Sequence, residues 1–146
     1  MVEISASSTV LIDAPPEHVL AAVADYVTVR PKILSPHFSG YRVLQGGRGA
    51  GTVATWKLQA TKLRLVDVKI TVNVAGMTVS EKDVNLSMIT NWTVAPSGAA
   101  SSVSVKTSWQ GSGGIRGLFE KIFAPLGLRK IQDELVVNLK KEVERR

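Results

Sequence analysis

Apolar and polar side chains alternate along the first twelve residues, where Val2, Ile4, Ala6, Val10 and Ile12 share one parity. A period of two is typical of a strand that buries one face and exposes the other. The pattern therefore predicts a first strand over residues 2–12.

Two short helices are expected next. The segment from Asp13 to Glu17 carries two prolines, which lack amides that a first helical turn leaves unpaired, and Glu17 suits the positive end of a helix dipole. This start predicts a helix over Pro15–Ala24 that buries Val19, Leu20 and Val23. A second short helix is expected over Pro31–Leu34, with Thr28 as its cap.

From Tyr41 to Trp109 the chain alternates almost throughout and is rich in Val, Ile, Thr and Trp. Six further strands are predicted, over Tyr41–Gln45, Thr52–Leu58, Leu63–Val74, Met77–Lys82, Met88–Ala95 and Val103–Trp109. The segments between them are short turns, which favour antiparallel neighbours and hence a meandering sheet.

The period changes after the glycines that follow Gly111. Apolar residues then recur mostly every three or four positions, which is typical of one face of an amphipathic helix: Leu118, Ile122, Leu128, Ile131, Leu135, Leu139 and Val143. Pro125 and Gly127 are expected to kink or interrupt this helix near its start.

This order of elements predicts an α+β fold in one domain of residues 1–146. A twisted antiparallel sheet of seven strands curls, and the long C-terminal helix can cover its concave face. One helix cannot fill so wide a groove, so an apolar cavity is expected between the helix and the sheet. Such a cavity is the default place for a small ligand.

The glycine-rich stretch QGGRGAGTVATW, residues 45–56, raises the alternative of a phosphate-binding loop. Such loops open directly into a helix whose amides hold the anion. This loop opens into Thr52, Val53, Ala54, Thr55 and Trp56, which alternate as a strand does. The sequence therefore predicts a turn between two strands and no nucleotide site. Specific binding of ATP or NAD that is lost on changing Gly49 or Gly51 would contradict this prediction.

Composition narrows the classes of partner. The chain has a formal net charge of +6, no cysteine and two histidines, His18 and His37. Disulfides and thiolate metal sites are excluded, and neither a metal nor another cofactor is expected. The basic residues are spread over strands and mixed with acids on the last segment, without a nucleic-acid signature, so no nucleic-acid partner is expected. With no signal peptide or membrane span in the sequence, we expect a cytoplasmic protein that is not an integral membrane protein.

Four segments resemble those of a known superfamily: IDAPPEHVLAAVADYVTVRPKIL, the GGRGAGT turn followed by W, ITNWTVAP, and GIRGLFEKIFAPLGLRKIQDELVVNLKKEV. They are similar to the START-like (SRPBCC), helix-grip superfamily, in its branch of polyketide cyclases/dehydrases and lipid transport proteins. The resemblance implies a helix-grip fold over essentially the whole chain. It leaves function open, because that fold serves lipid carriers, hormone binders, aromatase/cyclases and quinone-binding proteins.

Strand parity, the helical stripe and the resemblance together select the candidate ligand-binding residues. Parity selects the strand residues that face inward, and the apolar stripe selects the residues of the terminal helix. The resemblance alone implies that the two tyrosines lie at the cavity opening, together with Arg30. The predicted set is Tyr26, Tyr41, Trp56, Arg64, Val68, Ile70, Glu81, Met88, Thr90, Trp92, Val105, Thr107, Trp109, Leu128 and Leu135.

Three functions compete. The leading one is binding or transport of a hydrophobic small molecule: a lipid, polyketide, quinone or aromatic metabolite. The second is a polyketide aromatase/cyclase that transfers protons through Tyr26, Arg64, Glu81 or His37. The third is weak contact of the basic terminal helix with an anionic membrane.

Asp67 and Lys69 fall on the outward parity, and no catalytic triad or carboxylate pair appears. Parity alone leaves open whether strand-end charges such as Glu81 and Arg64 point inward or reach solvent, and the sequence leaves the oligomeric state undetermined.

Overall fold

The computed structural model describes residues 2–61, 64–85, 87–111 and 125–145. Its elements follow the predicted order of strand, two short helices, six strands and helix. They are β1 (Val2–Ile12), α1 (Pro16–Val23), α2 (Arg30–Ile33), β2 (Phe38–Gln45), β3 (Val53–Thr61), β4 (Arg64–Ala75), β5 (Thr78–Asp83), β6 (Ile89–Ser97), β7 (Ala100–Gly111) and α4 (Pro125–Glu144).

All seven strands form one antiparallel sheet in the order β1-β7-β6-β5-β4-β3-β2. Strands β2 to β7 are hairpin neighbours in sequence order, as their short turns predict, and β1 closes onto β7. The helix-grip fold expected from the sequence is confirmed. The predicted strand positions hold to within three residues. The largest differences are that β2 and β7 each begin three residues earlier than the alternation indicated and that β3 ends three residues later.

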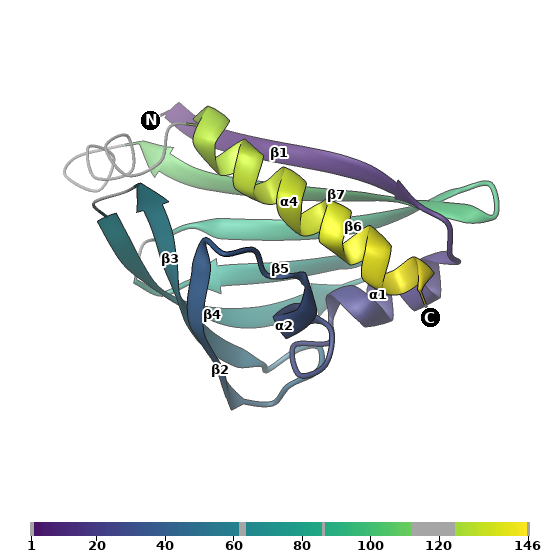
Figure 1. The fold of residues 1–146 in the computed structure, drawn as a ribbon, viewed down its shortest axis with the longest axis horizontal. Coiled ribbons are helices and arrows are strands. Elements are labelled where there is room, and N and C mark those ends of the chain that lie inside the picture. The colour runs from purple at the N-terminus through teal and green to yellow at the C-terminus, as the bar shows by residue number, and fades with distance from the viewer. Residues whose placement is uncertain (1, 62–63, 86, 112–124, 146) are drawn as a thin grey trace.

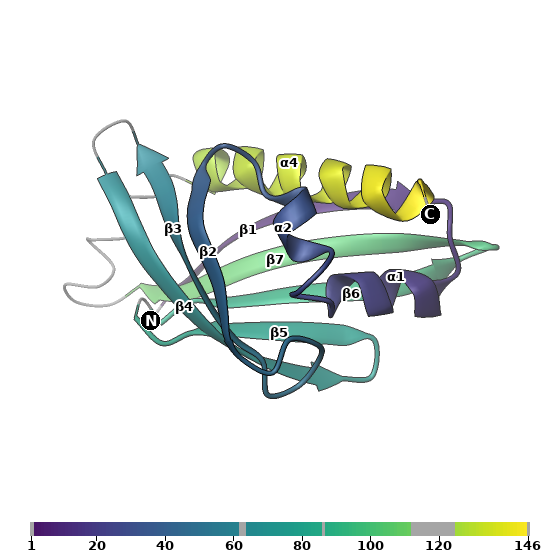
Figure 2. The same cartoon turned by 60° about the horizontal axis from the view of Figure 1, so that its bottom comes forward.

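Helix α4 lies along one face of the sheet, beside β1 and β7, and the sheet curls so that β2, β3 and β4 rise at one end (Figure 1). Figure 2 shows α1 and α2 on the same side as α4, so these three described helices face the concave surface. The rows that alternation assigns to the interior are buried there, whereas Asp67 and Lys69 are exposed as predicted. No helix among the described residues is long and apolar enough to cross a membrane.

The start of α1 follows the sequence signal: Pro15 is the N-cap residue, Pro16 opens the helix and Glu17 lies in the first turn. The predicted Thr28 cap of α2 is wrong. The N-cap residue of α2 is Val29, without a side-chain hydrogen bond, and the Thr28 hydroxyl instead donates to Asp25 Oδ2 at 2.6 Å. Asp25 also accepts the Thr28 amide at 2.9 Å through its side chain and the Arg30 amide at 3.1 Å through its carbonyl, so a local turn around Asp25 replaces the cap.

Helix α4 is described from Pro125 onward, and Gly127 lies inside it. Leu128, Ile131 and Leu139 are buried. The earlier part of the predicted stripe, Leu118 and Ile122, lies outside the described residues.

The glycine loop leads into β3, as predicted, and it also holds the segment between α1 and α2. Gly47 accepts the Tyr26 amide at 2.9 Å, and the Gly49 amide donates to Ala24 at 2.9 Å. A Cβ on Gly47 would lie 2.7 Å from Val27 Cγ2, and its φ of 145° disfavours other residues. The glycines therefore allow a close approach between two backbone segments, which fixes the position of Tyr26.

Candidate functional site: a cavity between the sheet and α4

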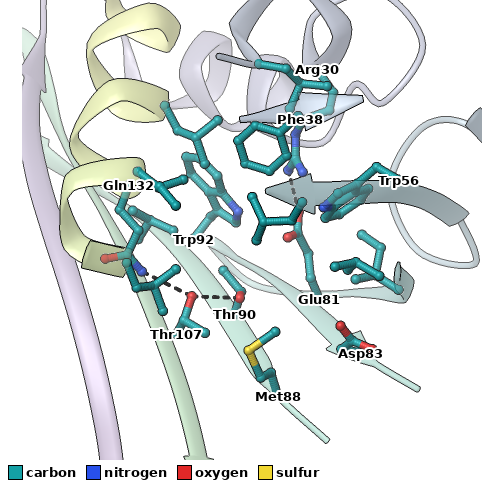
Figure 3. A pocket seen from close by; sticks show the side chains of 18 residues that line it. Arg30, Phe38, Trp56, Glu81, Asp83, Met88, Thr90, Trp92, Thr107 and Gln132 are labelled. Atoms are coloured by element: carbon teal, nitrogen blue, oxygen red, sulfur yellow. Dashed lines mark hydrogen bonds and ion pairs between the residues drawn. The ribbon is translucent and has the colours of Figure 1, made fainter. Parts of the chain in front are cut away.

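A cavity of about 70 Å³ lies between the concave face of the sheet and α4 (Figure 3). Strands β3 to β7 form its floor, α4 forms one wall, and α2 with the start of β2 closes another side. The lining is mostly apolar. It consists of Arg30, Leu34, Phe38, Trp56, Leu58, Val68, Ile70, Glu81, Asp83, Met88, Thr90, Trp92, Val105, Thr107, Leu128, Ile131, Gln132 and Leu135.

Two tryptophans from different strands provide the largest surfaces of the cavity. Trp56 is 7% exposed and Trp92 1%, and Figure 3 shows both indole nitrogens directed toward the space between them. The ring of Phe38 packs edge-on to Trp56 at 6.4 Å, and Tyr41 contacts the same indole at 6.1 Å. The aromatic side of the cavity is therefore built by residues from β2, β3 and β6.

A buried charged cluster forms the polar end of the cavity. Arg30 Nη2 and the Tyr26 hydroxyl both donate to Glu81 Oε2, and Arg30 and Glu81 are each 4% exposed. The guanidinium carbon lies 4.5 Å from the Tyr26 ring centroid, 5.3 Å from that of Trp92 and 5.9 Å from that of Trp56. A carboxylate and aromatic faces together compensate for removing the charge from water.

This cluster fixes the protonation of its members. Burial, and then the Glu81 carboxylate, raise the pKa of the Tyr26 phenol well above its usual range. Burial opposes the charge on Arg30, but the adjacent Glu81 outweighs it and raises the pKa of the guanidinium. Burial also raises the pKa of Tyr41 to about 12, and the Tyr41 hydroxyl donates to the Tyr26 carbonyl at 2.5 Å. Tyr26 therefore stays a phenol and Arg30 a cation near neutral pH.

A second hydrogen-bonded chain crosses the floor of the cavity toward α4. Gln132 Nε2 donates to Thr107 Oγ1 and to the Ala6 carbonyl, each at 3.1 Å, and Thr107 Oγ1 lies 2.8 Å from Thr90 Oγ1. The amide of Gln132 thereby links α4 to both β1 and β7. Among the described residues, no three His, Asp or Glu side chains gather as a metal site would require.

Most of the predicted ligand-binding residues come together in this one cavity. The residues that line it are Trp56, Val68, Ile70, Glu81, Met88, Thr90, Trp92, Val105, Thr107, Leu128 and Leu135. They come from β3 to β7 and from α4, as parity and the helical stripe predicted. Their role in binding a ligand stays a prediction.

Three predicted residues lie elsewhere among the described side chains. Tyr26 is buried against Arg30 and does not line the cavity, and Tyr41 contacts the Trp56 ring but does not line the cavity either. Trp109 is buried on the inward face, but it lies two residues beyond Thr107 along β7, opposite Ile4, so it falls past the end of the cavity. The side chain of Arg64, which opens β4, lies outside the described part of the chain.

His37, the proposed acid or base, does not line the cavity. Its Nε2 lies 3.3 Å from Glu134 Oε1 on α4, and both side chains are more than one-third exposed. The loop before β2 turns this side chain outward, while the next residue, Phe38, points inward.

Sequence reasoning missed several lining residues for different reasons. Leu58 and Asp83 share the inward parity of Trp56 and Glu81, and Ile131 belongs to the helical stripe, so the signal for these was present. Phe38 was left out because β2 was expected to begin at Tyr41. Gln132 gave no signal, since an amide on an amphipathic helix is typical of the solvent face.

Comparisons with known proteins agree with this architecture. The sequence model of the family "Polyketide cyclase / dehydrase and lipid transport" matches residues 3–144. Among solved structures, the KanY protein (ms6282), determined by NMR in solution, is 69% identical with a TM-score of 0.91, and the match covers 99% of each chain. No curated protein sequence matches the chain significantly.

More distant structures share the fold alone. TTHA0849 from Thermus thermophilus is 16% identical with a TM-score of 0.78, over 97% of this chain and 98% of that one. The Zhui aromatase/cyclase from Streptomyces sp. R1128 is 15% identical with a TM-score of 0.69, over 99% and 96%. Because the family model matches residues 3–144, the chain belongs to the polyketide cyclase/dehydrase and lipid transport family.

Proposed function

We propose that the protein binds or carries a hydrophobic small molecule in the cavity between the sheet and α4. The observation that carries this proposal is the lining itself: two tryptophans, a phenylalanine and aliphatic side chains surround a few buried polar groups. Binding sites for small molecules have this composition, in which apolar contact supplies affinity and a few polar groups set orientation.

The size of the cavity adds a requirement. Pockets that enclose a drug-sized molecule measure roughly 300–1,000 Å³, whereas this one measures about 70 Å³. A ligand of that size needs the walls to move. The side chains of Leu34 and Leu135 are only half-buried and make no polar bond across the cavity, so they can move at the least cost.

The aromatase/cyclase alternative has less support in the geometry. Of the groups expected to transfer protons, Tyr26 is buried as a phenol bonded to Glu81, and His37 faces outward. Glu81 lines the cavity, but its Oε2 is already engaged by Arg30 and Tyr26. The membrane-surface alternative is weakened because basic residues at the end of α4 pair with acids of the same helix, Lys140 with Glu144 at 2.5 Å and Arg145 with Glu142 at 2.7 Å.

Binding of the neutral fluorescent probe N-phenyl-1-naphthylamine tests the proposal. Trp56→Ala removes an inward ring, whereas Lys57→Ala removes the neighbouring outward side chain, which is exposed and bonded to Asp67 at 3.0 Å. We expect Trp56→Ala to weaken binding about tenfold or more, because it deletes a large apolar contact, and Lys57→Ala to leave affinity unchanged.

Equal losses in the two variants contradict the proposal. Trp56→Phe, which keeps an aromatic ring, serves where the alanine variant fails to fold, and thermal unfolding followed by circular dichroism verifies the fold of each. Mass spectrometry of small molecules extracted from the purified protein then identifies what the cavity takes.

A further inference from the structure

One buried donor in the cavity has no partner. Trp92 is 1% exposed, and its indole Nε1 makes no hydrogen bond with the described residues. A buried N–H left unpaired is costly because it has given up its hydrogen bond to water, so native proteins rarely tolerate one without a reason. In Figure 3 this nitrogen points into the open space of the cavity rather than into the packed sheet.

The neighbouring hydroxyls add a second donor. Thr90 and Thr107 have one hydroxyl hydrogen each, and the 2.8 Å bond between them uses one of the two. Gln132 donates a hydrogen bond to Thr107, so it does not use the other. No further hydrogen bond of either hydroxyl is formed with the described residues, so one hydrogen remains. Since Thr90 and Trp92 lie two residues apart on the inward face of β6, both donors serve the same region.

The charged residues at the polar end make a bound anion unfavourable. Arg30, the cation of the cavity lining that could receive a carboxylate, already pairs with Glu81 and stacks among three aromatic rings. An anionic ligand would have to break this buried pair and leave Glu81 without its partner, which is strongly destabilising. Glu81 and Trp92 are diagonal neighbours on β5 and β6, because Val79 pairs with Trp92 and Glu81 with Thr90. A negative charge beside the indole would therefore also lie close to Glu81.

We propose that Trp92 is a specificity-determining residue whose indole N–H receives a carbonyl oxygen of a neutral, otherwise apolar ligand. A carbonyl fits because its oxygen accepts a hydrogen bond and carries no charge. This inference rests on the proposed binding function, and it adds the chemical class of the ligand: neutral aromatic or aliphatic ketones and related carbonyl compounds, as distinct from plain hydrocarbons and free fatty acids.

Two small probes of nearly equal shape test the inference. Acetophenone carries a C=O group where α-methylstyrene carries C=CH2, so they differ mainly in the acceptor. Titrations of ¹⁵N-labelled protein followed by NMR measure both affinities and report directly on the three indole N–H signals. We expect acetophenone to bind about tenfold more tightly, since it satisfies a buried donor that the hydrocarbon leaves unpaired, and to shift the Trp92 indole signal downfield.

Trp92→Phe keeps an aromatic ring and removes the N–H, so the preference for acetophenone should fall to about one. Trp109→Phe is the matched control: it makes the same change at a buried tryptophan of the inward face that does not line the cavity, and it should keep the preference. Where Trp92→Phe does not fold, the ratio of the two affinities and the indole shift in the unmodified protein decide the matter.

The results separate the two levels of the proposal. The inference is wrong if both probes bind equally, or if acetophenone shifts cavity signals but not the Trp92 indole signal. In that case water satisfies the N–H, and the proposed binding function stands. If neither probe binds and N-phenyl-1-naphthylamine also fails to bind, both the inference and the proposed function are overturned.

Discussion

The two ends of the cavity are built on different principles. At the polar end, Arg30, Glu81 and Tyr26 are fixed by directional bonds that converge on one carboxylate oxygen. At the opposite end, Leu128, Ile131 and Leu135 on α4 make apolar contacts that have no preferred direction. Directional networks hold one geometry, whereas aliphatic contacts permit small displacements at modest cost. We infer that the polar end orients a ligand and that the aliphatic side chains of α4, which unlike Gln132 make no directional bond, adjust to its size.

The largest expected effect follows from removing Glu81. Glu81→Ala leaves Arg30 buried without its carboxylate, which typically costs about 3–5 kcal/mol of stability. Urea unfolding measures this loss. The double variant Glu81→Leu with Arg30→Met removes both charges and should be clearly more stable than Glu81→Ala. Equal stability of the two variants would mean that the charged pair does not organise this end.

Leu139→Ala tests the apolar packing of α4. Leu139 is fully buried, and its truncation should cost about 2–5 kcal/mol in urea unfolding. Val137→Ala is the control, since Val137 is exposed on the same helix and its truncation should change stability by no more than about 0.5 kcal/mol. Similar losses in both variants would be incompatible with the observed face of α4.

Leu135→Ala tests whether Leu135 is part of the cavity wall or part of the packed core. Leu135 is half-buried and lines the cavity, so its truncation should destabilise the protein less than Leu139→Ala does, by about 1–2 kcal/mol. The enlarged apolar end should accept N-phenyl-1-naphthylamine with at least the original affinity. A tenfold weaker affinity would show that this end is as rigid as the polar one.

The smallest effect at neutral pH, and the most specific, comes from the two tyrosines. The pKa of Tyr41 is raised to about 12 and that of Tyr26 is raised further. Because both folded-state pKa values exceed the ordinary value of about 10, the corresponding stability is complete below pH 10 and is lost as the pH rises. Tyrosinate absorbance should show no ionisation near pH 10, and in Tyr41→Phe none before unfolding. A normal titration of either phenol would contradict the burial of the cluster.

Much of the fold was readable from the sequence because its signals are local. Strict alternation marked the strands, short turns implied antiparallel pairing, and Pro15 and Pro16 marked the start of α1. The same parity assigned Trp56, Trp92 and Val105 to the inward face, where the structure places them. Local rules failed where groups compete. Thr28 was expected to cap α2, but its hydroxyl donates to the Asp25 carboxylate, and the Arg30 amide at the start of α2 donates to the Asp25 carbonyl.

The partners across the cavity could not be derived in this way. Nothing in the spacing of Tyr26, Arg30 and Glu81 shows that they meet, because more than fifty residues separate the tyrosine from the carboxylate. Likewise, the sequence gives no sign that the amide of Gln132 joins α4 to β1 and β7, because its bonds form only when the helix packs on those strands. The sequence by itself determined the order of the elements, their buried faces and hence an apolar hollow under one helix, since periodicity is a property of neighbouring residues. Only the tertiary structure decided which inward groups neutralise one another and which donor remains unpaired, because hydrogen bonds and charge pairs depend on distances between strands and helices that the one-dimensional pattern does not contain.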